Sequence, residues 1–237
     1  MKNGLIMIMF ACGSSSSSSP PPAPAPVASP EHAHGHAAHV HHGHGGHRFE
    51  KADDWAPMFD DPKRDEWQKP DAVVAALAIA PGMTVADIGA GTGYFESRLA
   101  AAVGPTGKVL AVDIEADMVR YIGERALREK TPQVSARLAT ADDPKLPAAS
   151  LDRILIVDTW HHVEKRGDYT RKLVSALKPG GALFIVDFTL ETERGPPKTM
   201  RLSAESVRTE LEQAGLRVSV VDAGLPDQYV LKAELAR

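Results

Sequence analysis

Three glycines at alternate positions, Gly89, Gly91 and Gly93, follow the apolar segment 84–87 and precede an apolar stripe with helical spacing. Glycine tolerates positive φ and lets a ligand approach the backbone, while the first turn of the helix offers unpaired N–H groups. A strand, a turn and a helix in this order form a cradle for a nucleotide-type cofactor. Tyr94 stands where the dinucleotide fingerprint G-x-G-x-x-G has its third glycine. A bulky ring there would crowd a pyrophosphate, so the spacing disfavours a dinucleotide.

Aspartates end three of the apolar segments. Asp87 ends the segment before the first glycine, and this position suits a ligand that carries an ammonium group. Asp113 lies 26 residues further on (113 − 87), where a carboxylate can accept two hydrogen bonds from a ribose diol. Asp158 ends the apolar run 151–157, which only Asp152 and Arg153 interrupt at its start. Ligands of open α/β sheets bind outside the carboxyl ends of the strands, so we expect these aspartates at one site.

The segment 85–95 resembles the first motif of class I S-adenosylmethionine-dependent methyltransferases. The segments 112–114, 139–147, 155–163 and 177–183 resemble the later motifs in the same order, and the resemblance covers roughly residues 70–235. It implies S-adenosylmethionine as the cofactor, with Asp113 on the ribose, Ile114 beside the adenine and Asp142 on the adenine amino group. The cofactor-binding residues that it implies are Asp87, Gly89, Ala90, Gly91, Gly93, Tyr94, Asp113, Ile114, Ala141, Asp142 and Asp158.

Alternating apolar segments and helical stripes predict an α/β fold with a doubly wound, Rossmann-like sheet and right-handed crossovers. We expect seven strands, mostly parallel, with a C-terminal antiparallel hairpin. The segments predicted as strands are 84–87, 109–112, 134–139, 151–157, 182–188, 216–221 and 229–235. Lys178-Pro179-Gly180-Gly181 is predicted as a turn before the fifth strand.

His161 and His162 are the only histidines beyond residue 47, and they follow the fourth predicted strand. Methyl transfer from a sulfonium needs mainly alignment of the two reactants. A general base contributes when the acceptor must lose a proton, and either histidine is a candidate for that catalytic role. The alternative is that the pair caps the loop or packs against Trp160.

The first 47 residues differ in composition from the rest of the chain. Residues 1–12 resemble a bacterial lipoprotein signal with Cys12 as the lipid acceptor, which predicts a lipoprotein of the cell envelope; a cytoplasmic protein is the alternative. Residues 13–47 are predicted to be a disordered linker rich in serine, proline and alanine. Its histidines form either a solvated spacer or a loose metal-binding tract without fixed geometry; they are His32, His34, His36, His39, His41, His42, His44 and His47.

Residues 48–69 are predicted to be an irregular arm that precedes the methyltransferase domain, 70–237. Its aromatic residues, among them Trp55, Phe59 and Trp67, either form a lid over the cofactor or simply anchor the arm. The net charge is −4, and there is no basic stripe for nucleic acid, so small-molecule and protein substrates remain open. The leading expectation is a methyltransferase that acts on a small molecule. The competing functions are a non-catalytic S-adenosylmethionine-binding or metal-binding lipoprotein and an NAD-dependent reductase, the latter disfavoured by Tyr94.

Overall fold

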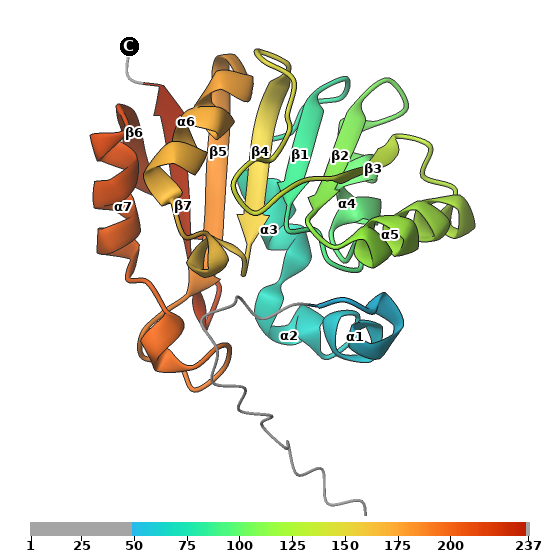
Figure 1. The fold of residues 1–237 in the computed structure, drawn as a ribbon, viewed down its shortest axis with the longest axis horizontal. Helices are drawn as coiled ribbons and strands as arrows, with labels where there is room; N and C mark the ends of the chain where they lie inside the picture. The colour runs from blue at the N-terminus through green and yellow to red at the C-terminus, as the bar shows by residue number, and fades with distance from the viewer. Residues whose placement is uncertain (1–48, 236–237) are drawn as a thin grey trace, which may run out of the picture. The chain divides into compact units, whose positions relative to one another are not determined.

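Seven strands form one sheet. They are β1 (Thr84–Ile88), β2 (Lys108–Asp113), β3 (Val134–Leu138), β4 (Leu151–Val157), β5 (Leu177–Phe188), β6 (Leu216–Val220) and β7 (Gln228–Leu235). The computed structural model describes residues 49–235, and its strand order is β3-β2-β1-β4-β5-β7-β6 (Figure 1). The first five strands pair in parallel, whereas β7 is antiparallel to both β5 and β6. The predicted fold class is confirmed.

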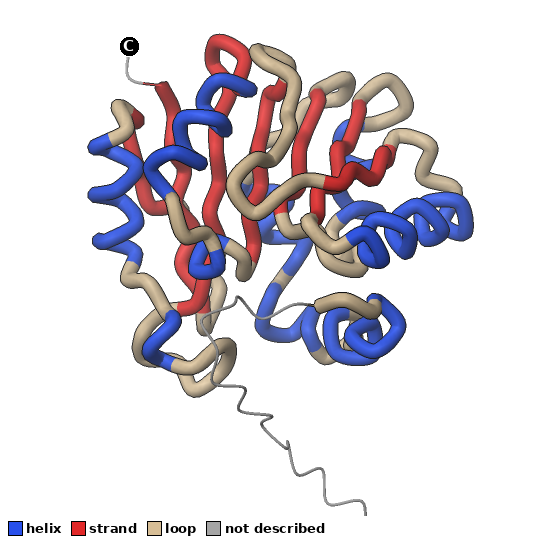
Figure 2. The backbone as a smooth tube through the Cα atoms, in the orientation of Figure 1, coloured by secondary structure: helices blue, strands red, loops and turns tan. Residues whose placement is uncertain are grey.

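Helices cover both faces of this sheet (Figure 2). The helices α3 (Pro70–Ala76) and α4 (Glu96–Val103) contribute to one apolar cluster, and α6 (Arg166–Ala176) and α7 (Ala204–Gln213) contribute to the other. The helix α5 (Ala116–Glu129) packs against β2 and β3. Two 3-10 helices, η1 (Trp160–His162) and η2 (Lys198–Met200), follow β4 and β5. Coverage on both faces explains why residues 154–157 of β4 are all apolar and buried.

The predicted turn at residues 178–181 is part of β5, and this prediction is corrected. Leu151 pairs with Leu177, but Arg153 pairs with Ala182, so the register between β4 and β5 shifts across the predicted turn. Gly180 has a φ of +80°. The shift leaves extra residues in β5 that do not pair with β4, and a proline and two glycines can lie within a strand at such an irregularity. The strand therefore begins earlier than the composition predicts.

The arm is helical rather than irregular, which corrects a second prediction. The helices α1 (Ala52–Phe59) and α2 (Arg64–Gln68) belong to the same compact unit as the sheet. They lie at the carboxyl ends of the strands (Figure 1). The Ala52 N–H donates to Asp117 of α5 at 2.9 Å, so a tertiary contact stabilises the first turn of α1. The two prolines of the segment concealed this helix because they suggest irregular structure.

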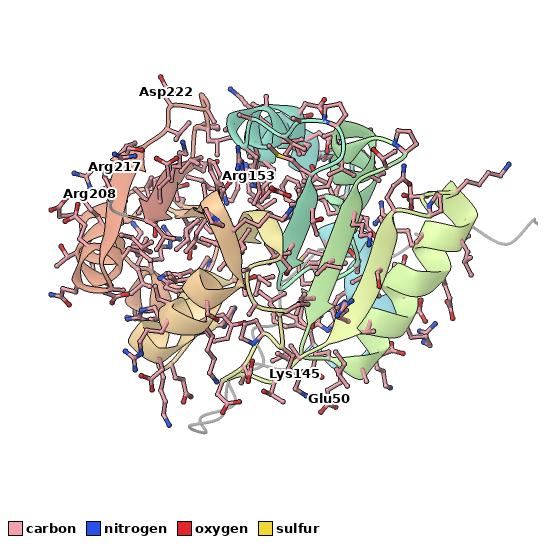
Figure 3. The ribbon with its side chains drawn as sticks, turned by 90° about the horizontal axis from the view of Figure 1, so that it is seen from above. Glu50, Lys145, Arg153, Arg208, Arg217 and Asp222 are labelled. Atoms are coloured by element: carbon pink, nitrogen blue, oxygen red, sulfur yellow. The ribbon has the colours of Figure 1, made fainter. Side chains whose placement is uncertain are left out.

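The signal with Cys12, the linker and the histidine tract lie outside the described residues, and the predictions about them stay predictions. Within residues 49–235, the helices are all too short or too polar to span a bilayer. The same part of the chain contains no cluster of three or more histidine, cysteine, aspartate or glutamate side chains suited to a metal ion. Charged side chains such as Arg208, Arg217 and Asp222 lie at the outer edge of the molecule (Figure 3).

Candidate functional site

The glycine loop, residues 89–93, joins β1 to the turn before α4. All three of its glycines have positive φ: +75° at Gly89, +57° at Gly91 and +82° at Gly93. A Cβ atom at Gly89 would lie 2.3 Å from the Thr159 hydroxyl oxygen, which follows β4. Only glycine fits there, because both the backbone conformation and the available space exclude a side chain. The loop is thus packed between the carboxyl ends of β1 and β4.

Asp113 at the end of β2 is fixed against this loop. Its Oδ2 accepts the Gly91 N–H at 2.8 Å, and its Oδ1 accepts the Glu115 N–H at 2.9 Å. Each oxygen retains a lone pair, so the carboxylate can still accept hydrogen bonds from a diol. Burial raises the pKa of Asp113, although the three backbone N–H groups around it, led by that of Glu115, act in the opposite direction. Its carboxylate is therefore pre-positioned, as predicted for a ribose-binding residue.

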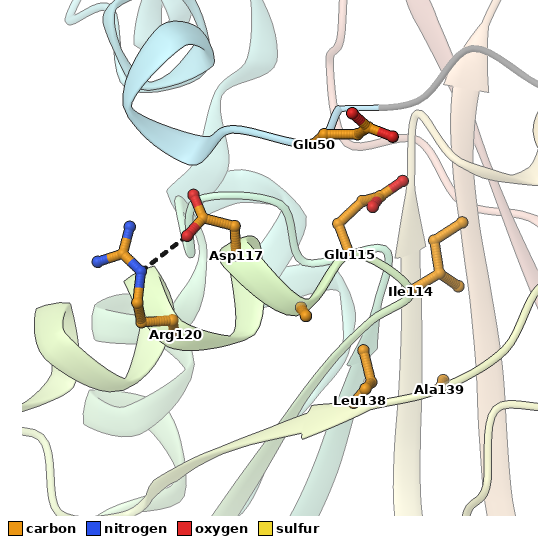
Figure 4. Close-up of a pocket in the computed structure, with 8 residues that line it drawn as sticks. Glu50, Ile114, Glu115, Asp117, Arg120, Leu138 and Ala139 are labelled. Carbon is orange, nitrogen blue, oxygen red and sulfur yellow. Dashed lines mark hydrogen bonds and ion pairs between the residues drawn. The ribbon is translucent and has the colours of Figure 1, made fainter.

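A hollow of about 500 Å³ is lined by Ile114 and Glu115, the two residues that follow Asp113 (Figure 4). Ile114 and Leu138, each about half exposed, give it apolar walls. Such flat apolar surfaces suit an aromatic base. Sequence analysis found Ile114 but missed Leu138, although Leu138 ends the strand next to β2. The lining residues are Glu50, Ile114, Glu115, Ala116, Asp117, Arg120, Leu138 and Ala139.

The structure places the other two predicted adenine contacts outside this hollow. Ala141 and Asp142 are exposed in the turn after β3. The Asp142 carboxylate accepts the Thr140 hydroxyl at 2.8 Å, and Asp142 lines a separate polar hollow on α6 together with Lys165 and Lys172. Their contact with a base stays a prediction.

Asp87 in β1 is paired with a second buried acid that the sequence analysis missed. Asp87 and Glu96, the first residue of α4, are 2% and 3% exposed. Neither oxygen of Glu96 has a hydrogen-bond partner that meets ordinary geometry among the described residues. Burial raises the pKa of Asp87 to about 7 and places that of Glu96 well above its usual range. The two buried carboxyl groups lie beside the glycine loop, and burial favours their protonated forms.

The arm covers the glycine loop. The Phe59 ring of α1 lies 3.4 Å from the position that a Cβ at Gly91 would take. Asp60 accepts the Thr92 hydroxyl at 2.9 Å and pairs with Arg125 of α5 at 2.8 Å. Trp55 stacks on Phe59, and the Phe49 ring packs edge-to-face on Trp55 and tilted against Phe59. Of the two predicted roles, this position favours a lid.

Arg64 of α2 extends the cover toward β4. Its guanidinium stacks on the Tyr94 ring at 4.1 Å and forms an ion pair with Asp158 at 3.6 Å. Tyr94 also donates a short hydrogen bond to Asp65, and it is buried by the arm. Sequence analysis placed Tyr94 at the site but did not identify Arg64, which lies 94 residues before Asp158 (158 − 64).

The Asp158 carboxylate is held by two side-chain amides, Gln228 directly and Gln68 through Gln228. The Gln68 amide donates to Gln228 of β7 at 2.5 Å, and the Gln228 amide donates a short hydrogen bond to Asp158. The φ of Asp158 is +53°, a left-handed conformation at the end of β4. Burial raises the pKa of Asp158 to about 7. The structure thus brings the predicted residue Asp158 to the same sheet edge as Asp87 and Asp113.

The two candidate histidines differ in their surroundings. The His161 side chain is 3% exposed, and its Nδ1 lies 3.0 Å from both carboxylate oxygens of Asp187, the penultimate residue of β5. His162 is exposed, and its ring lies 4.2 Å from that of His161. Sequence analysis missed Asp187, although its place at the carboxyl end of a predicted strand matches that of the three predicted aspartates.

Comparisons with known proteins agree with this geometry. Residues 85–181 match the family described as a methyltransferase domain. The chain is 30% identical over 173 residues to the ubiquinone/menaquinone biosynthesis C-methyltransferase UbiE of Ectopseudomonas mendocina, a match covering 62% of this chain and 66% of that protein. Its fold is similar to that of a SAM-dependent methyltransferase from Aquifex aeolicus, with a TM-score of 0.73, 30% identity, and coverage of 77% of this chain and 98% of that one.

A more distant structure shares the fold. It is the geranyl diphosphate C-methyltransferase from Streptomyces coelicolor, solved with Mg²⁺, geranyl diphosphate and S-adenosyl-L-homocysteine. The TM-score is 0.61 at 16% identity, and the match covers 75% of this chain and 81% of that one.

Proposed function

Because this chain belongs to the S-adenosylmethionine-dependent methyltransferases, we propose that it transfers a methyl group to a small-molecule acceptor beneath its arm. The observation that carries the proposal is the position of Phe59 against the glycine loop, 3.4 Å from a Cβ position at Gly91. A macromolecular acceptor would have to displace both arm helices to reach the loop. A small molecule requires only a transient opening.

The residues at the sheet edge fit the cofactor. Asp113 retains lone pairs for the ribose, and Ile114 and Leu138 offer apolar walls for the adenine. Glu96 lies against the glycine loop, 3.4 Å from a Cβ position at Gly93, and its oxygens have no hydrogen-bond partner among residues 49–235. When bound, S-adenosylmethionine supplies a methyl group already activated on a sulfonium. The protein therefore needs to bind, orient and shield the reactants rather than activate the methyl group.

The arm supplies the shielding. Phe59 and its aromatic neighbours exclude water from the glycine loop, and Arg64 of the arm contacts both Tyr94, which follows the loop, and Asp158, which follows β4. Excluding water strengthens the electrostatic interactions of the buried carboxylates with a cationic ligand. His161 is the candidate base, because its ring is buried at the end of β4 while His162 is exposed.

Calorimetry of the full chain with S-adenosylhomocysteine and with NAD tests the cofactor. We expect binding of S-adenosylhomocysteine only, and binding of NAD alone would contradict the proposal. Incubation with methyl-tritiated S-adenosylmethionine and either a metabolite extract, total protein or total RNA tests the acceptor. Label in small molecules is expected. Label confined to protein or RNA would overturn the small-molecule acceptor.

A further inference from the structure

We propose that Arg64 of the arm is a carboxylate-binding residue, which exchanges Asp158 for the carboxylate of the cofactor's amino-acid end when the cofactor binds. The inference rests on the proposed function and gives the arm a part in selecting the cofactor. Nη2 of Arg64 lies 3.6 Å from Oδ2 of Asp158, which is too long for a hydrogen bond. Both side chains are largely buried, with 16% and 20% of their surface exposed.

The guanidinium of Arg64 has N–H groups to spare. Its Nε and Nη2 donate to the Gln68 side-chain oxygen at 3.3 and 3.1 Å, and its Nη1 donates to the Phe59 carbonyl at 2.9 Å. Because a guanidinium carries five N–H groups and three are used, two make no hydrogen bond to residues 49–235. All three bonds connect residues of the arm. They fix the guanidinium to the arm and leave its remaining donors for a partner outside it.

Two neighbouring arginines already have close carboxylate partners. Arg98 of α4 pairs with Asp65 at 2.8 Å, and Arg125 of α5 pairs with Asp60 at 2.8 Å. Of these three arginines, Arg64 alone has no hydrogen-bonded carboxylate within the described part of the chain. A largely buried cation is unfavourable without such a partner, and a ligand carboxylate would supply one with two N–H groups at once.

Arg64 also lies where the amino-acid end of the cofactor is expected. Its guanidinium is 4.1 Å from the centre of the Tyr94 ring, which directly follows the glycine loop. Phe59, whose carbonyl accepts from Arg64, places its ring 3.4 Å from a Cβ position at Gly91. We expect the adenosine at the ends of β2 and β3, so the rest of the cofactor extends along the glycine loop toward the ends of β1 and β4. Asp158 directly follows β4.

The exchange of partners keeps the charges balanced. An α-amino-acid end carries a carboxylate and an ammonium group, so it can pair with Arg64 and with Asp158 at the same time. Oδ1 of Asp158 accepts the Gln228 amide, whereas Oδ2 makes no hydrogen bond among residues 49–235 and can accept one from the ammonium. Burial raises the pKa of Asp158 to about 7, so at neutral pH this acid is a weak counter-ion for Arg64.

Isothermal titration calorimetry of the full chain compares S-adenosylhomocysteine with its decarboxylated analogue, which keeps the amine. The wild type should bind the analogue about 10-fold or more weakly, the usual effect of losing a hydrogen bond to a charged group. Arg64→Met should weaken binding of S-adenosylhomocysteine by a similar factor and binding of the analogue by less than about threefold, because the analogue has no carboxylate to lose. Equal weakening of both ligands by Arg64→Met would overturn the proposal.

Arg98→Met is the matched control for a merely structural role of Arg64. It removes the arginine that pairs with Asp65 of α2 and so loosens the arm without changing the proposed carboxylate site. We expect it to change the affinities of S-adenosylhomocysteine and of the decarboxylated analogue by the same factor. A selective loss of S-adenosylhomocysteine binding in this variant would contradict the assignment to Arg64.

Hydrogen–deuterium exchange of the wild type tests the exchange of partners without any variant. Saturating S-adenosylhomocysteine should slow the exchange of amides in residues 52–68, because a hydrogen-bonded carboxylate holds Arg64 more firmly than Asp158 does. The decarboxylated analogue at equal saturation should slow it much less, and equal protection by both ligands would overturn the proposal. Equal affinity of the wild type for both ligands would refute the role of Arg64 alone, whereas binding of neither would refute the proposed function.

Discussion

Asp113 shows how one side chain at a strand end acquires a defined role. Both of its carboxylate oxygens accept backbone N–H groups, one from the glycine loop and one from the segment that enters α5. These bonds orient the carboxylate before any ligand arrives, so little side-chain freedom is lost on binding. At the residue scale, the site is therefore organised by backbone amides as much as by side chains.

Replacing Asp113 by alanine should weaken S-adenosylhomocysteine binding by about 1.5 to 3 kcal/mol, because hydrogen bonds to a charged group are lost. Isothermal titration calorimetry measures the difference. Asp168→Ala removes an exposed aspartate of α6 and serves as the matched control, with no change expected. Equal affinity of the Asp113 variant and the wild type would show that the ribose assignment is wrong.

Gly89→Ala should destabilise the protein by about 1 to 3 kcal/mol, since the added Cβ would lie 2.3 Å from the Thr159 hydroxyl oxygen at a φ of +75°. Urea denaturation gives the free energy of unfolding. Gly123→Ala is the control, because a Cβ at this position in α5 meets no atom within 4 Å, and alanine favours a helix. It should stabilise by about 0.5 to 1 kcal/mol. A neutral Gly89 variant would contradict the packing argument.

The buried acid Asp87 should make stability fall as pH rises from about 4 to 7. Burial raises its pKa from 3.8 to about 7, so the folded protein holds a proton in this range that the unfolded chain has already released. Removing that proton at higher pH disfavours the folded state by up to about 1.4 kcal/mol per pH unit. In urea titrations at pH 5, 6 and 7, Asp87→Asn should flatten this slope. An unchanged slope would mean that Asp87 titrates normally.

At the scale of elements, the arm helices α1 and α2 are packed against the carboxyl ends of the strands. The helix α1 contacts the glycine loop through Phe59, and α2 contacts β7 through the Gln68 and Gln228 amides. Trp67 of α2 also packs on Phe188 at the end of β5, with ring centroids 5.6 Å apart. Because α1 and α2 are short, their order depends on these contacts rather than on helix propensity.

Arg64→Ala should make the arm helices open more often without affecting the central strands. The variant loses the stack on Tyr94 and the ion pair with Asp158, so the amides of residues 52–68 should exchange faster by hydrogen–deuterium mass spectrometry, while those of β4 and β5 stay protected. Arg217→Ala removes an arginine that pairs with Glu234 at the far edge of the sheet and should leave the arm unchanged. Unaltered exchange in the Arg64 variant would contradict the role of this contact.

At the scale of the whole molecule, the strand order brings the site together. The strands β2 and β3 lie on one side of β1, whereas β4 and β5 lie on the other side, so the strand order reverses between β1 and β4. The glycine loop, Asp113, Asp158 and His161 follow or end these parallel strands, and they therefore lie at the same edge of the sheet. Binding sites of doubly wound sheets form at this reversal because the connections leave it to opposite faces. The antiparallel β7 then adds Gln228 and Tyr229 from the far end of the chain.

Cofactor binding should stabilise the whole fold, since the residues that we expect to contact the cofactor come from β1, β2, β3 and the arm. S-adenosylhomocysteine at 100 times its Kd should add about 2.7 kcal/mol. For a domain of this size that corresponds to a rise in Tm of about 5 to 11 °C. Differential scanning calorimetry measures the shift, and NAD at the same concentration should give none. A Tm that does not respond to S-adenosylhomocysteine would contradict the cofactor assignment.

Local patterns were enough to predict much of this protein. Apolar runs predicted β4 over residues 151–157, and the glycine spacing predicted the loop that follows β1. The aspartates Asp87, Asp113 and Asp158 were correctly placed at strand ends. The arm helices were not predicted, because contacts such as Ala52 with Asp117 stabilise them from outside the segment.

The sequence by itself determined the strand segments, the helices that connect them and the aspartates at the ends of β1, β2 and β4. These follow from hydrophobic periodicity and from the backbone freedom of glycine. Only the tertiary structure decided which of those residues meet. Gln68 and Gln228 are 160 residues apart, and Asp187 selects His161 over its neighbour His162. Such pairs depend on strand order and on burial, which bring distant side chains within hydrogen-bond distance and leave no local pattern in the chain.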